Sequence, residues 1–523
     1  MSKTSNGARA LLDAAHTLGI RVCFANPGTT ELALVRALNE VPGIRPILGL
    51  FEGVCTGAAD GYARVSGRPA LTLLHLGPGL ANGLANLHNA RRAHSPVINI
   101  VGDHATWHLP FDAPLTSDIE SLAQPMSVQV VRLESSTSVA ISAREAVSKS
   151  MAPPGGVVTL IAPSDLMEDP ADPASSGVAG PAAPERALRS VSRKRIDEVA
   201  SRLLAGNPAV LLLGADGLSE RGQRAAQQIA NATGARLIME SYPAIVPLGG
   251  DLPRLERLAY FPDDVLNQLG SSSVLLAGAR APVSYFGYAG KPSQLAQSER
   301  LLELASPGED CALALEQLAE RLRGTAGTSS APPTPSFHCE DSDNLSPIAI
   351  AEELALQLPE AAIVSLEGST LGGPYLQRAH RARRHRVMTN TGGAIGQGLP
   401  CAVGAAVAAP DARVICLQSD GSAQYTIQSL WTMAREALNV TVIICANHRY
   451  GILQTELRRS GASLDQPAES VLTRLDSPRV DWIALAKGYG VPGVRATSTA
   501  EFRQALVVGL QTAGPYLIEA QLA

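Results

Sequence analysis

The feature that most constrains the fold of this chain is a repeated alternation of short apolar runs with helical stretches. In the first 170 residues, segments such as VCTGAADGYARVSG separate the apolar runs RVCFAN, ALTLLHL, PVINIVGD and GVVTLIAP. The pattern returns twice, first with NPAVLLLGADGL, ARLIMES and SSVLLAGARAP and then with AAIVSLEG, RVICLQSDG, VTVIICAN and GPYLIEAQL. Strands that alternate with helices favour parallel, doubly wound sheets. We therefore predict an α/β protein with three doubly wound parallel-sheet domains.

Two linker-like segments set the expected domain boundaries. Residues 168–187 are rich in Pro, Ala, Ser and Gly, and residues 324–347 read GTAGTSSAPPTPSFHCEDSDNLSP. Such compositions are typical of linkers. The domains are therefore expected at 1–170, 190–325 and 345–523. The length of 523 residues agrees with about three domains of roughly 150 residues each.

Composition narrows the class of function. The chain has 45% hydrophobic and 17% charged residues and a net charge of −5 without a basic block, so a nucleic acid partner is not expected. No apolar run is long enough to span a membrane or to act as a secretory signal, so no membrane partner is expected. The seven cysteines include no CxxC pair, which argues against a disulfide framework or a zinc site and fits a cytoplasmic location.

Two apolar runs of the third expected domain, 345–523, are each followed by a polar residue able to hold a cation. Asp420 follows one run and Asn447 follows the next, 27 residues further along. If the two strands are neighbours, these side chains converge at the carboxyl edge of the sheet, where doubly wound folds bind ligands. Mg²⁺ prefers a few protein oxygens together with water and phosphate, and Gly421 and Ser422 open a helix whose free N–H groups favour phosphate. The stretch predicts a site for a Mg²⁺-bridged diphosphate; the alternative is an Asp N-cap and an ordinary loop Asn.

The same stretch, SDGSAQYTIQSLWTMAREALNVTVIICAN, resembles the thiamine diphosphate motif, which begins GDG and ends NN. Five further segments look like this family: NPGTTE, LFEGVCTGAADGYAR, LLHLGPGLANGLANLHNA, TGGAIGQGLPCAVGAA and LAKGYGV. Nearly the whole chain is therefore similar to thiamine diphosphate-dependent 2-oxo acid enzymes, and to acetolactate synthase and benzoylformate decarboxylase in particular. The resemblance implies thiamine diphosphate and Mg²⁺ as cofactors and a 2-oxo acid as substrate.

The resemblance also assigns roles at the diphosphate and metal half of the site. Asp420 and Asn447 match the side-chain ligands of Mg²⁺, and Arg449 matches the position that supplies a backbone carbonyl. Ser369 and Thr370 match the residues on the diphosphate. Two positions depart from the motif: Ser419 replaces its first Gly and Ala446 its first Asn, changes able to alter a tight turn and to weaken support around the metal. They leave open a catalytically weak paralogue that acts as a structural or regulatory partner.

The half of the site that activates the cofactor is expected near the start of the chain. Glu52 stands at the end of an apolar run, directly before a Gly- and Ala-rich helix, and matches the glutamate that bonds the aminopyrimidine and activates the cofactor. As an isolated residue it would be an N-terminal helix charge. Ile395 matches the bulky apolar residue beneath the bent cofactor. Gly393 is one of the glycines around it that let the backbone approach the ring.

The expected substrate residues are His75 and Thr29. His75 matches a pocket histidine of benzoylformate decarboxylase, where acetolactate synthases commonly carry glutamine, and an imidazole can relay protons near neutral pH. Thr29 matches a residue that contacts the substrate carboxylate. In the middle block, Tyr285, Phe286 and Tyr288 either line the pocket or are core or subunit-interface aromatics. The turn GADGLSERG is not a GxGxxG, so FAD is not expected.

Two activities therefore stay open. The leading one is an acetolactate synthase-like decarboxylase or carboligase of 2-oxo acids. The alternative is a benzoylformate decarboxylase-like, non-oxidative decarboxylase of aryl or branched 2-oxo acids. The resemblance further implies a homodimer or homotetramer whose active sites lie between subunits, with Glu52 from one chain and the metal residues from its partner.

Overall fold

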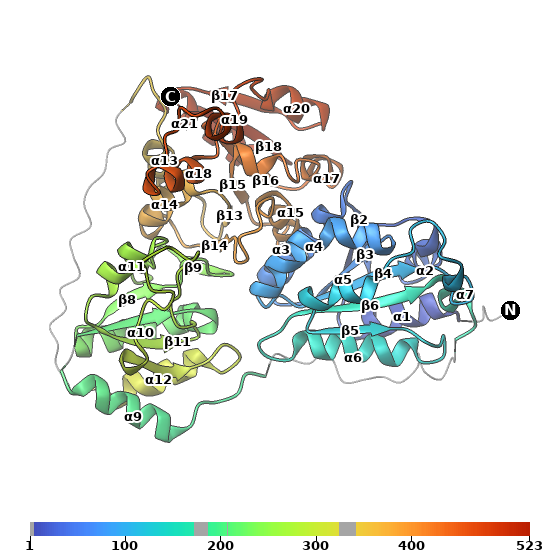
Figure 1. Ribbon diagram of the computed structural model, residues 1–523, viewed down its shortest axis with the longest axis horizontal. Helices are drawn as coiled ribbons and strands as arrows, with labels where there is room; N and C mark the ends of the chain where they lie inside the picture. The colour runs from blue at the N-terminus through green and yellow to red at the C-terminus, as the bar shows by residue number, and fades with distance from the viewer. Residues whose placement is uncertain (1–4, 172–186, 207, 324–340, 523) are drawn as a thin grey trace.

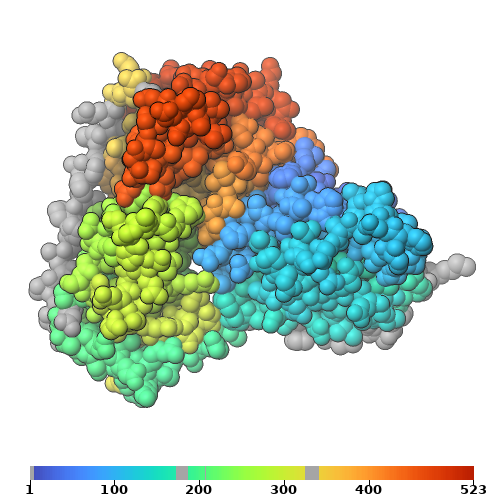
Figure 2. Space-filling view, in the orientation of Figure 1, coloured from blue at the N-terminus to red at the C-terminus, as the bar shows by residue number. Residues whose placement is uncertain are grey.

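The computed structural model of the protein describes residues 5–171, 187–206, 208–323 and 341–522. It contains three sheets, each formed mainly by one stretch of the chain, and Figure 2 shows the three parts as lobes that meet near the centre of the molecule. The α/β fold with three parallel-sheet domains is confirmed.

The expected linkers at 168–187 and 324–347 fall mostly outside the described residues. The exact domain boundaries therefore stay a prediction. None of the described helices is long and apolar enough to cross a membrane.

The first sheet has six parallel strands in the order β2-β1-β3-β4-β6-β5. Its strands are β1 (Val22–Asn26), β2 (Arg45–Leu48), β3 (Ala70–Leu74), β4 (Val97–Asp103), β5 (Gln129–Arg132) and β6 (Val157–Pro163). Its helices are α1 (Gly7–Thr17), α2 (Leu32–Glu40), α3 (Glu52–Ser66), α4 (Leu76–Arg92), α5 (Ile119–Ala123), α6 (Val139–Met151) and α7 (Ser164–Glu168).

Both faces of this sheet are covered, which explains why its strands are almost wholly apolar. Side chains alternate between the two faces of a strand. On β3, Leu71 and Leu73 belong to the hydrophobic cluster that contains α1, α2 and α6. Ala70 and Leu74 belong to the opposite cluster, which contains α3 and α4.

The central sheet has five parallel strands in the order β10-β8-β7-β11-β12. Its strands are β7 (Ala209–Leu213), β8 (Arg236–Met239), β10 (Glu256–Arg257), β11 (Ser273–Ala277) and β12 (Leu301–Ala305). The helices beside it are α9 (Arg193–Leu204), α10 (Glu220–Thr233), α11 (Pro262–Leu269) and α12 (Cys311–Arg321).

The third sheet has seven strands in the order β17-β18-β16-β15-β13-β14-β9. Its strands from the C-terminal part are β13 (Ile363–Leu366), β14 (His385–Thr389), β15 (Val414–Ser419), β16 (Val440–Ala446), β17 (Gly493–Ala496) and β18 (Tyr516–Gln521). Its helices are α13 (Pro347–Gln357), α14 (Ser369–Arg378), α15 (Gly398–Ala408), α16 (Asp420–Ala423), α17 (Ser429–Arg435), α18 (Gly451–Arg459), α19 (Pro467–Thr473), α20 (Trp482–Gly488) and α21 (Thr499–Gln511).

One strand differs from the expected pattern. β9 (Val246–Leu248) comes from the central stretch of the chain but pairs antiparallel with β14 at the edge of the third sheet. A free edge leaves backbone N–H and C=O groups unpaired, and a short strand that covers it satisfies them. The proline at position 247 fits an edge strand, where a missing N–H is tolerated.

The first and third domains of one chain meet through α3 and α15, which lie side by side at the centre of Figure 1. The contact depends on small residues. A Cβ atom at Gly404 would overlap with the backbone of Ala58, and one at Gly61 would overlap with the backbone of Cys401. Much of the glycine and alanine of these segments therefore serves close helix packing, and the packing fixes one domain against the other.

Candidate active site

Asp420 and Asn447 lie at the ends of neighbouring strands, as the sequence predicts. β15 and β16 pair in parallel, with Ser419 opposite Cys445, so both residues follow at the same edge of the sheet. The Asp420 carboxylate is buried and joins the two strand ends, because Oδ1 accepts from Gly421 N at 2.9 Å and Oδ2 accepts from His448 N at 2.6 Å. Burial raises the pKa of Asp420, and the backbone donors partly offset this.

The other two predicted metal residues lie on one turn after β16, and this turn contacts a predicted diphosphate residue of α14. Asn447 Nδ2 donates to Thr370 Oγ1 at 2.9 Å, and Asn447 Oδ1 accepts from Arg449 N at 3.1 Å. The Arg449 carbonyl accepts from Gly451 N at 3.0 Å. A carbonyl oxygen has two lone pairs, so this bond leaves one free for a cation.

The helix expected after Asp420 differs in detail. It is a single turn, α16, that begins at Asp420 itself. The N–H of Gly421 already donates to the Asp420 carboxylate, and the Ser422 hydroxyl accepts from Gln418 Nε2 at 2.7 Å. The Gly421 N–H is thus already bonded within this turn, and the roles of Gly421 and Ser422 at the diphosphate stay a prediction. By contrast, Ser369 is exposed at the start of the ten-residue helix α14, whose first N–H groups have no partner within the helix.

The two departures from the motif fit the backbone without strain. Ser419 has φ −84° and ψ 150°, an extended conformation open to any residue, and its hydroxyl lies where a Cβ of Gly368 would be. Ala446 is fully buried as the last residue of β16. Neither position forms the tight turn that the sequence comparison suggested.

Ile395 lies on the loop 390–397 between β14 and α15, with 38% of its surface exposed. A carboxylate that sequence reasoning missed braces this loop. Glu367 Oε1 accepts from Gly396 N at 2.7 Å, and Oε2 accepts from Gly398 N at 2.6 Å. Glu367 is buried, which raises its pKa. Glu367 directly follows β13, so its place at a strand end was a signal for a role, although the sequence does not show its partners.

The first domain brings Glu52 and His75 together. Glu52 is the first residue of α3 and its Oε2 accepts from Asn82 Nδ2 at 3.0 Å, while His75 directly precedes α4. Gly79 lies between them, because a Cβ there would be 3.2 Å from Glu52 Oε1 and 3.4 Å from His75 Cβ. The starts of α3 and α4 thus lie beside each other, with the Glu52 carboxylate and the Cβ atom of His75 next to Gly79.

A buried glutamate that sequence reasoning also missed holds His75. Glu31 is fully buried, and its Oε2 lies 2.8 Å from His75 Nδ1 and accepts from Gly28 N at 2.7 Å. Since a carboxylate only accepts, His75 Nδ1 carries the proton and Nε2 is left for other partners. A Cβ at Gly102 of β4 would overlap with the Glu31 carboxylate, so this glycine makes the room. The motif NPGTTE contains Glu31, but the partner comes from another strand.

Thr29, the predicted contact of the substrate carboxylate, has an exposed side chain. The neighbouring Thr30 hydroxyl is the one beside the histidine, 3.3 Å from His75 Nδ1, and it also donates to Glu31 Oε1 at 2.6 Å. The role of Thr29 stays a prediction.

The central domain reaches the loop 390–397 through an aromatic side chain. The Tyr285 hydroxyl lies against Gly393, which has φ +80°, and a Cβ there would overlap with it. Tyr285 and Phe286 are 42% and 55% exposed, so they are not core residues, and the pocket and the subunit interface remain as alternatives. Tyr288 donates to Glu456 Oε1 of α18 at 2.8 Å.

The glycines of the turn after β7 are used for packing. A Cβ at Gly214 would lie 2.7 Å from the Gly278 carbonyl, and one at Gly217 would lie 2.5 Å from the Ala277 carbonyl. The expectation that FAD does not bind stays a prediction.

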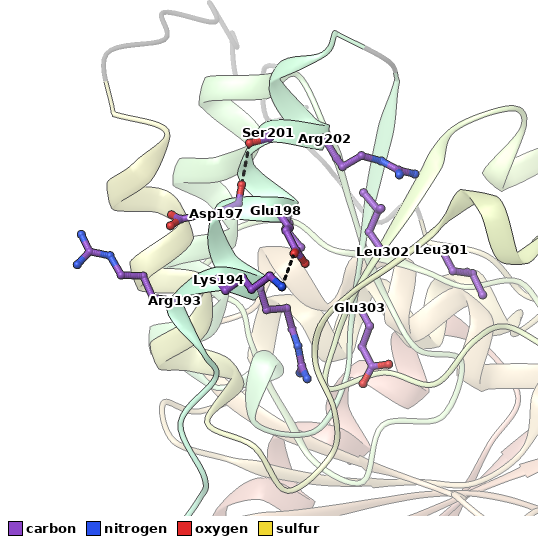
Figure 3. Close-up of a pocket in the computed structure, with 11 residues that line it drawn as sticks. Arg193, Lys194, Asp197, Glu198, Ser201, Arg202, Leu301, Leu302 and Glu303 are labelled. Carbon is purple, nitrogen blue, oxygen red and sulfur yellow. Dashed lines mark hydrogen bonds and ion pairs between the residues drawn. The ribbon is translucent and has the colours of Figure 1, made fainter.

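Two hollows lie outside the predicted site residues. One, of about 830 Å³, is lined by α9 and β12 of the central domain and mixes cations such as Arg193 with acids such as Glu303 (Figure 3). The other, of about 1180 Å³, lies between the central domain and helices α18 and α19. Its lining includes Leu453 and Glu456 of α18 but none of the predicted metal residues.

Comparisons with known proteins agree with this geometry. The family model described as the thiamine pyrophosphate enzyme, N-terminal TPP binding domain, matches residues 5–124, and the corresponding C-terminal TPP binding domain matches residues 373–520. A Mycobacterium tuberculosis protein named "Putative acetolactate synthase large subunit IlvX" is 46% identical over 519 residues, 98% of each chain. Benzoylformate decarboxylase of Pseudomonas aeruginosa is 31% identical over 530 residues, 96% of each chain.

Solved structures share the fold over the full length. A thiamine diphosphate-dependent 4-hydroxybenzoylformate decarboxylase of Rhodococcus jostii matches with a TM-score of 0.86 at 24% identity, over 99% of both chains. Benzoylformate decarboxylase from Polynucleobacter necessarius matches with a TM-score of 0.82 at 22% identity, over 99% of both chains. These likenesses concern the fold alone. Together with the two family models and the relative at 46% identity, they lead to one assignment: the chain belongs to the thiamine pyrophosphate-dependent enzymes.

Proposed function

We propose that the chain uses thiamine diphosphate and Mg²⁺ to decarboxylate 2-oxo acids. The observation that carries the proposal is the convergence of Glu52 and His75 on Gly79, with the His75 ring fixed by the buried Glu31. A carboxylate that would activate the cofactor and a histidine that would handle substrate protons then lie at two adjacent helix starts. The relatives named acetolactate synthase and benzoylformate decarboxylase support the substrate class.

The residues present fit the two cofactors. Asp420, Asn447 and the Arg449 carbonyl are oxygen ligands of the kind Mg²⁺ prefers. The Asp420 carboxylate accepts hydrogen bonds from two backbone N–H groups, and the His448 ring lies 4.0 Å from it. The start of α14, with Ser369 and Thr370, would hold the diphosphate. Ile395 is an apolar side chain exposed on its loop, which suits a residue beneath the cofactor ring.

When bound, thiamine diphosphate supplies the electron sink for the pair left as the 2-oxo acid loses CO₂. The protein's own groups orient the reactants and manage protons. Glu52 would share a proton with N1′ of the aminopyrimidine. His75 would hold or deliver a proton at Nε2, because Glu31 occupies Nδ1. Thr29 would contact the substrate carboxylate.

We further propose that each active site lies between two chains of a homodimer, or of a homotetramer built from two such dimers. In the described part of one chain, Glu52 bonds Asn82 whereas Asp420 bonds Gly421 and His448, so the two acids share no partner. Both the first and the third domain expose large apolar side chains. Leu50 and Trp107 lie on loops of the first domain, and Leu472 and Tyr425 on the third, and a partner chain would cover them.

The substrate is tested with a panel of 2-oxo acids. Small, branched and aryl acids are incubated with the loaded enzyme, with and without an acceptor aldehyde, and the products are identified by mass. An aldehyde as sole product supports decarboxylation. Failure to consume any 2-oxo acid, by enzyme shown to hold cofactor, overturns the proposal.

A second candidate is carboligation, in which the same first half of the reaction ends on another carbonyl. The similarity to the relative named acetolactate synthase favours it. A 2-hydroxy ketone or acetolactate among the products of the same panel would select this activity.

The shared site is tested by complementation between two inactive variants. Glu52→Gln and Asp420→Ala are mixed under conditions that exchange subunits. Random pairing makes about a quarter of all sites intact, so activity should rise toward that fraction of the wild type. Each variant exchanged with itself is the control. If subunits demonstrably exchange and no activity returns, each chain builds its own site.

A further inference from the structure

The loop 390–397 carries Ile395 and belongs to the third domain, yet α4 of the first domain holds it. Asn89 of α4 pairs with the backbone of Ala394, the residue before Ile395. Its Oδ1 accepts from Ala394 N at 3.2 Å and its Nδ2 donates to Ala394 O at 2.8 Å. The Asn89 side chain is fully buried, so water cannot replace these bonds at low cost.

Other contacts complete this seat. The Asn89 carbonyl accepts from Thr391 Oγ1 at 2.8 Å, and His88 Nε2 lies 3.0 Å from the Gly392 carbonyl. A Cβ at Gly392 would overlap with the Asn89 amide, so the loop needs glycine at this point. The loop is thus fitted to α4 by backbone and side-chain contacts along most of its length.

Asn86, one helical turn earlier, connects the loop with Glu52. Its Nδ2 donates to the Gly53 carbonyl at 2.8 Å and lies 3.5 Å from the Gly396 carbonyl. Its Oδ1 accepts from Asn89 Nδ2 at 3.2 Å. Gly53 follows Glu52 and Gly396 follows Ile395. One buried side chain therefore touches the backbone next to the activating glutamate and next to the residue expected beneath the cofactor.

We propose that Asn86 and Asn89 are positioning residues that set the Ile395 loop relative to Glu52. They act through the backbone of Gly53, Ala394 and Gly396, and not by contact with substrate or cofactor. The proposal depends on thiamine diphosphate as cofactor, but not on a 2-oxo acid as substrate. In the dimer proposed above, the Glu52 and Ile395 of one chain serve two different sites, so the pair of asparagines joins those sites through a single helix.

The alternative is that the asparagines only stabilise the fold, and Asn99 provides a matched control. Asn99 is also fully buried in the first domain, and it accepts from Thr72 Oγ1 at 2.7 Å and donates to Thr159 Oγ1 at 3.1 Å. It has no described contact with the loop. Asn99→Ala should therefore cost stability of a similar kind and leave the loop in place.

The first measurement is hydrogen exchange of the amides of residues 391–396 in the full-length protein without cofactor. In Asn89→Ala these amides should exchange about tenfold faster than in the wild type, since two bonds to Ala394 are lost. Asn86→Ala should give a smaller increase. The increase should be confined to the loop, and Asn99→Ala should not show it.

The second measurement is exchange of the C2 proton of bound cofactor, followed by NMR after acid quench at saturating cofactor. Asn89→Ala should slow this exchange by about tenfold, although Glu52 and Ile395 are unchanged. The proposal is overturned if the loop amides of Asn89→Ala exchange as in the wild type, or if C2 exchange falls no further than in Asn99→Ala. If Asn89→Ala does not fold, the isosteric Thr391→Val takes its place in both measurements; it removes the bond to the Asn89 carbonyl and also the bond that Thr391 Oγ1 accepts from Arg64.

Neither measurement requires a substrate. A wild-type protein that binds cofactor, exchanges the C2 proton and consumes no 2-oxo acid would overturn the proposed function and leave this proposal standing. Loop amides that exchange as slowly in every variant as in the wild type would overturn this proposal and leave the proposed function standing.

Discussion

The two half-sites of this chain are built in different ways. In the first domain, Glu52 and His75 stand at the starts of long helices, α3 with 15 residues and α4 with 17. There the imidazole is held by another side chain, Glu31. In the third domain, Asp420 and Asn447 directly follow strand ends, and α16, which begins at Asp420, has only four residues. There the carboxylate is held by the backbone N–H groups of Gly421 and His448.

The difference follows from the work each half is proposed to do. A group that transfers protons needs a fixed tautomer, and only a specific partner side chain can fix it. A group that holds a cation needs an oxygen in place, and backbone donors can hold it whatever the neighbouring side chains are. The first half should therefore be sensitive to small changes in supporting residues. The half-site in the third domain should tolerate changes around its ligands, as Ser419 and Ala446 already suggest.

The largest effect is expected at the first half-site. Glu52→Gln should bind cofactor nearly as well as the wild type, since the amide can still accept from Asn82, but it cannot share a proton with N1′. Exchange of the cofactor C2 proton should slow by about 10²- to 10⁴-fold, the usual range for loss of acid–base catalysis. The rate is measured by NMR after acid quench. An unchanged rate would remove Glu52 from the proposed mechanism.

At the half-site in the third domain, the strongest expected effect concerns the binding of thiamine diphosphate. Asp420→Ala should lower the Mg²⁺-dependent affinity for thiamine diphosphate by about 100-fold or more, because a metal ligand is lost. The protein should still fold, with some loss of stability, because the N–H groups of Gly421 and His448 lose their acceptor. Calorimetric titration gives the affinity and thermal unfolding checks the fold. The exposed Asp411 serves as control, and Asp411→Ala should bind normally. Full affinity in Asp420→Ala would contradict the metal assignment.

The fold and the positions of the predicted metal residues could be predicted because they follow from local patterns in the sequence. The residues that hold the site in place, such as Glu31 and Glu367, follow no such pattern. Strands buried on both faces must be apolar runs, so the alternation revealed the sheets. Asp420 and Asn447 bracket one strand-helix-strand unit, so their convergence was predictable. Glu31 and Glu367 act on partners that other strands deliver, and Gly102 of β4 makes room for one of them. Local periodicity carries no record of such contacts. β9 is three residues long and contains proline, too short a pattern to recognise.

A third prediction concerns support within the first half-site. Glu31→Gln should lower kcat/KM by about tenfold and change its pH profile, because an amide does not hold His75 Nδ1 as a fixed donor. Cofactor affinity should stay unchanged, since Glu31 lies behind the histidine. The decisive comparison is the double variant. If Glu31 acts through His75, then Glu31→Gln added to His75→Ala has no further effect, whereas additive losses would assign Glu31 a separate, structural role.

The smallest effect is expected where the half-site in the third domain departs from the motif of the family. Ser419→Gly restores the motif residue, but the backbone at this position is extended, at φ −84° and ψ 150°, and needs no glycine. The affinity for thiamine diphosphate should therefore change by less than about threefold, and stability should fall by about 0.5–1 kcal/mol from the added chain entropy. Titration and thermal unfolding measure the two. A large gain in affinity would mean that the Ser419 hydroxyl, which lies against Gly368 at the start of α14, obstructs the diphosphate. The half-site in the third domain would then be as sensitive to its supporting residues as the half-site in the first domain, and the contrast between the two would fail.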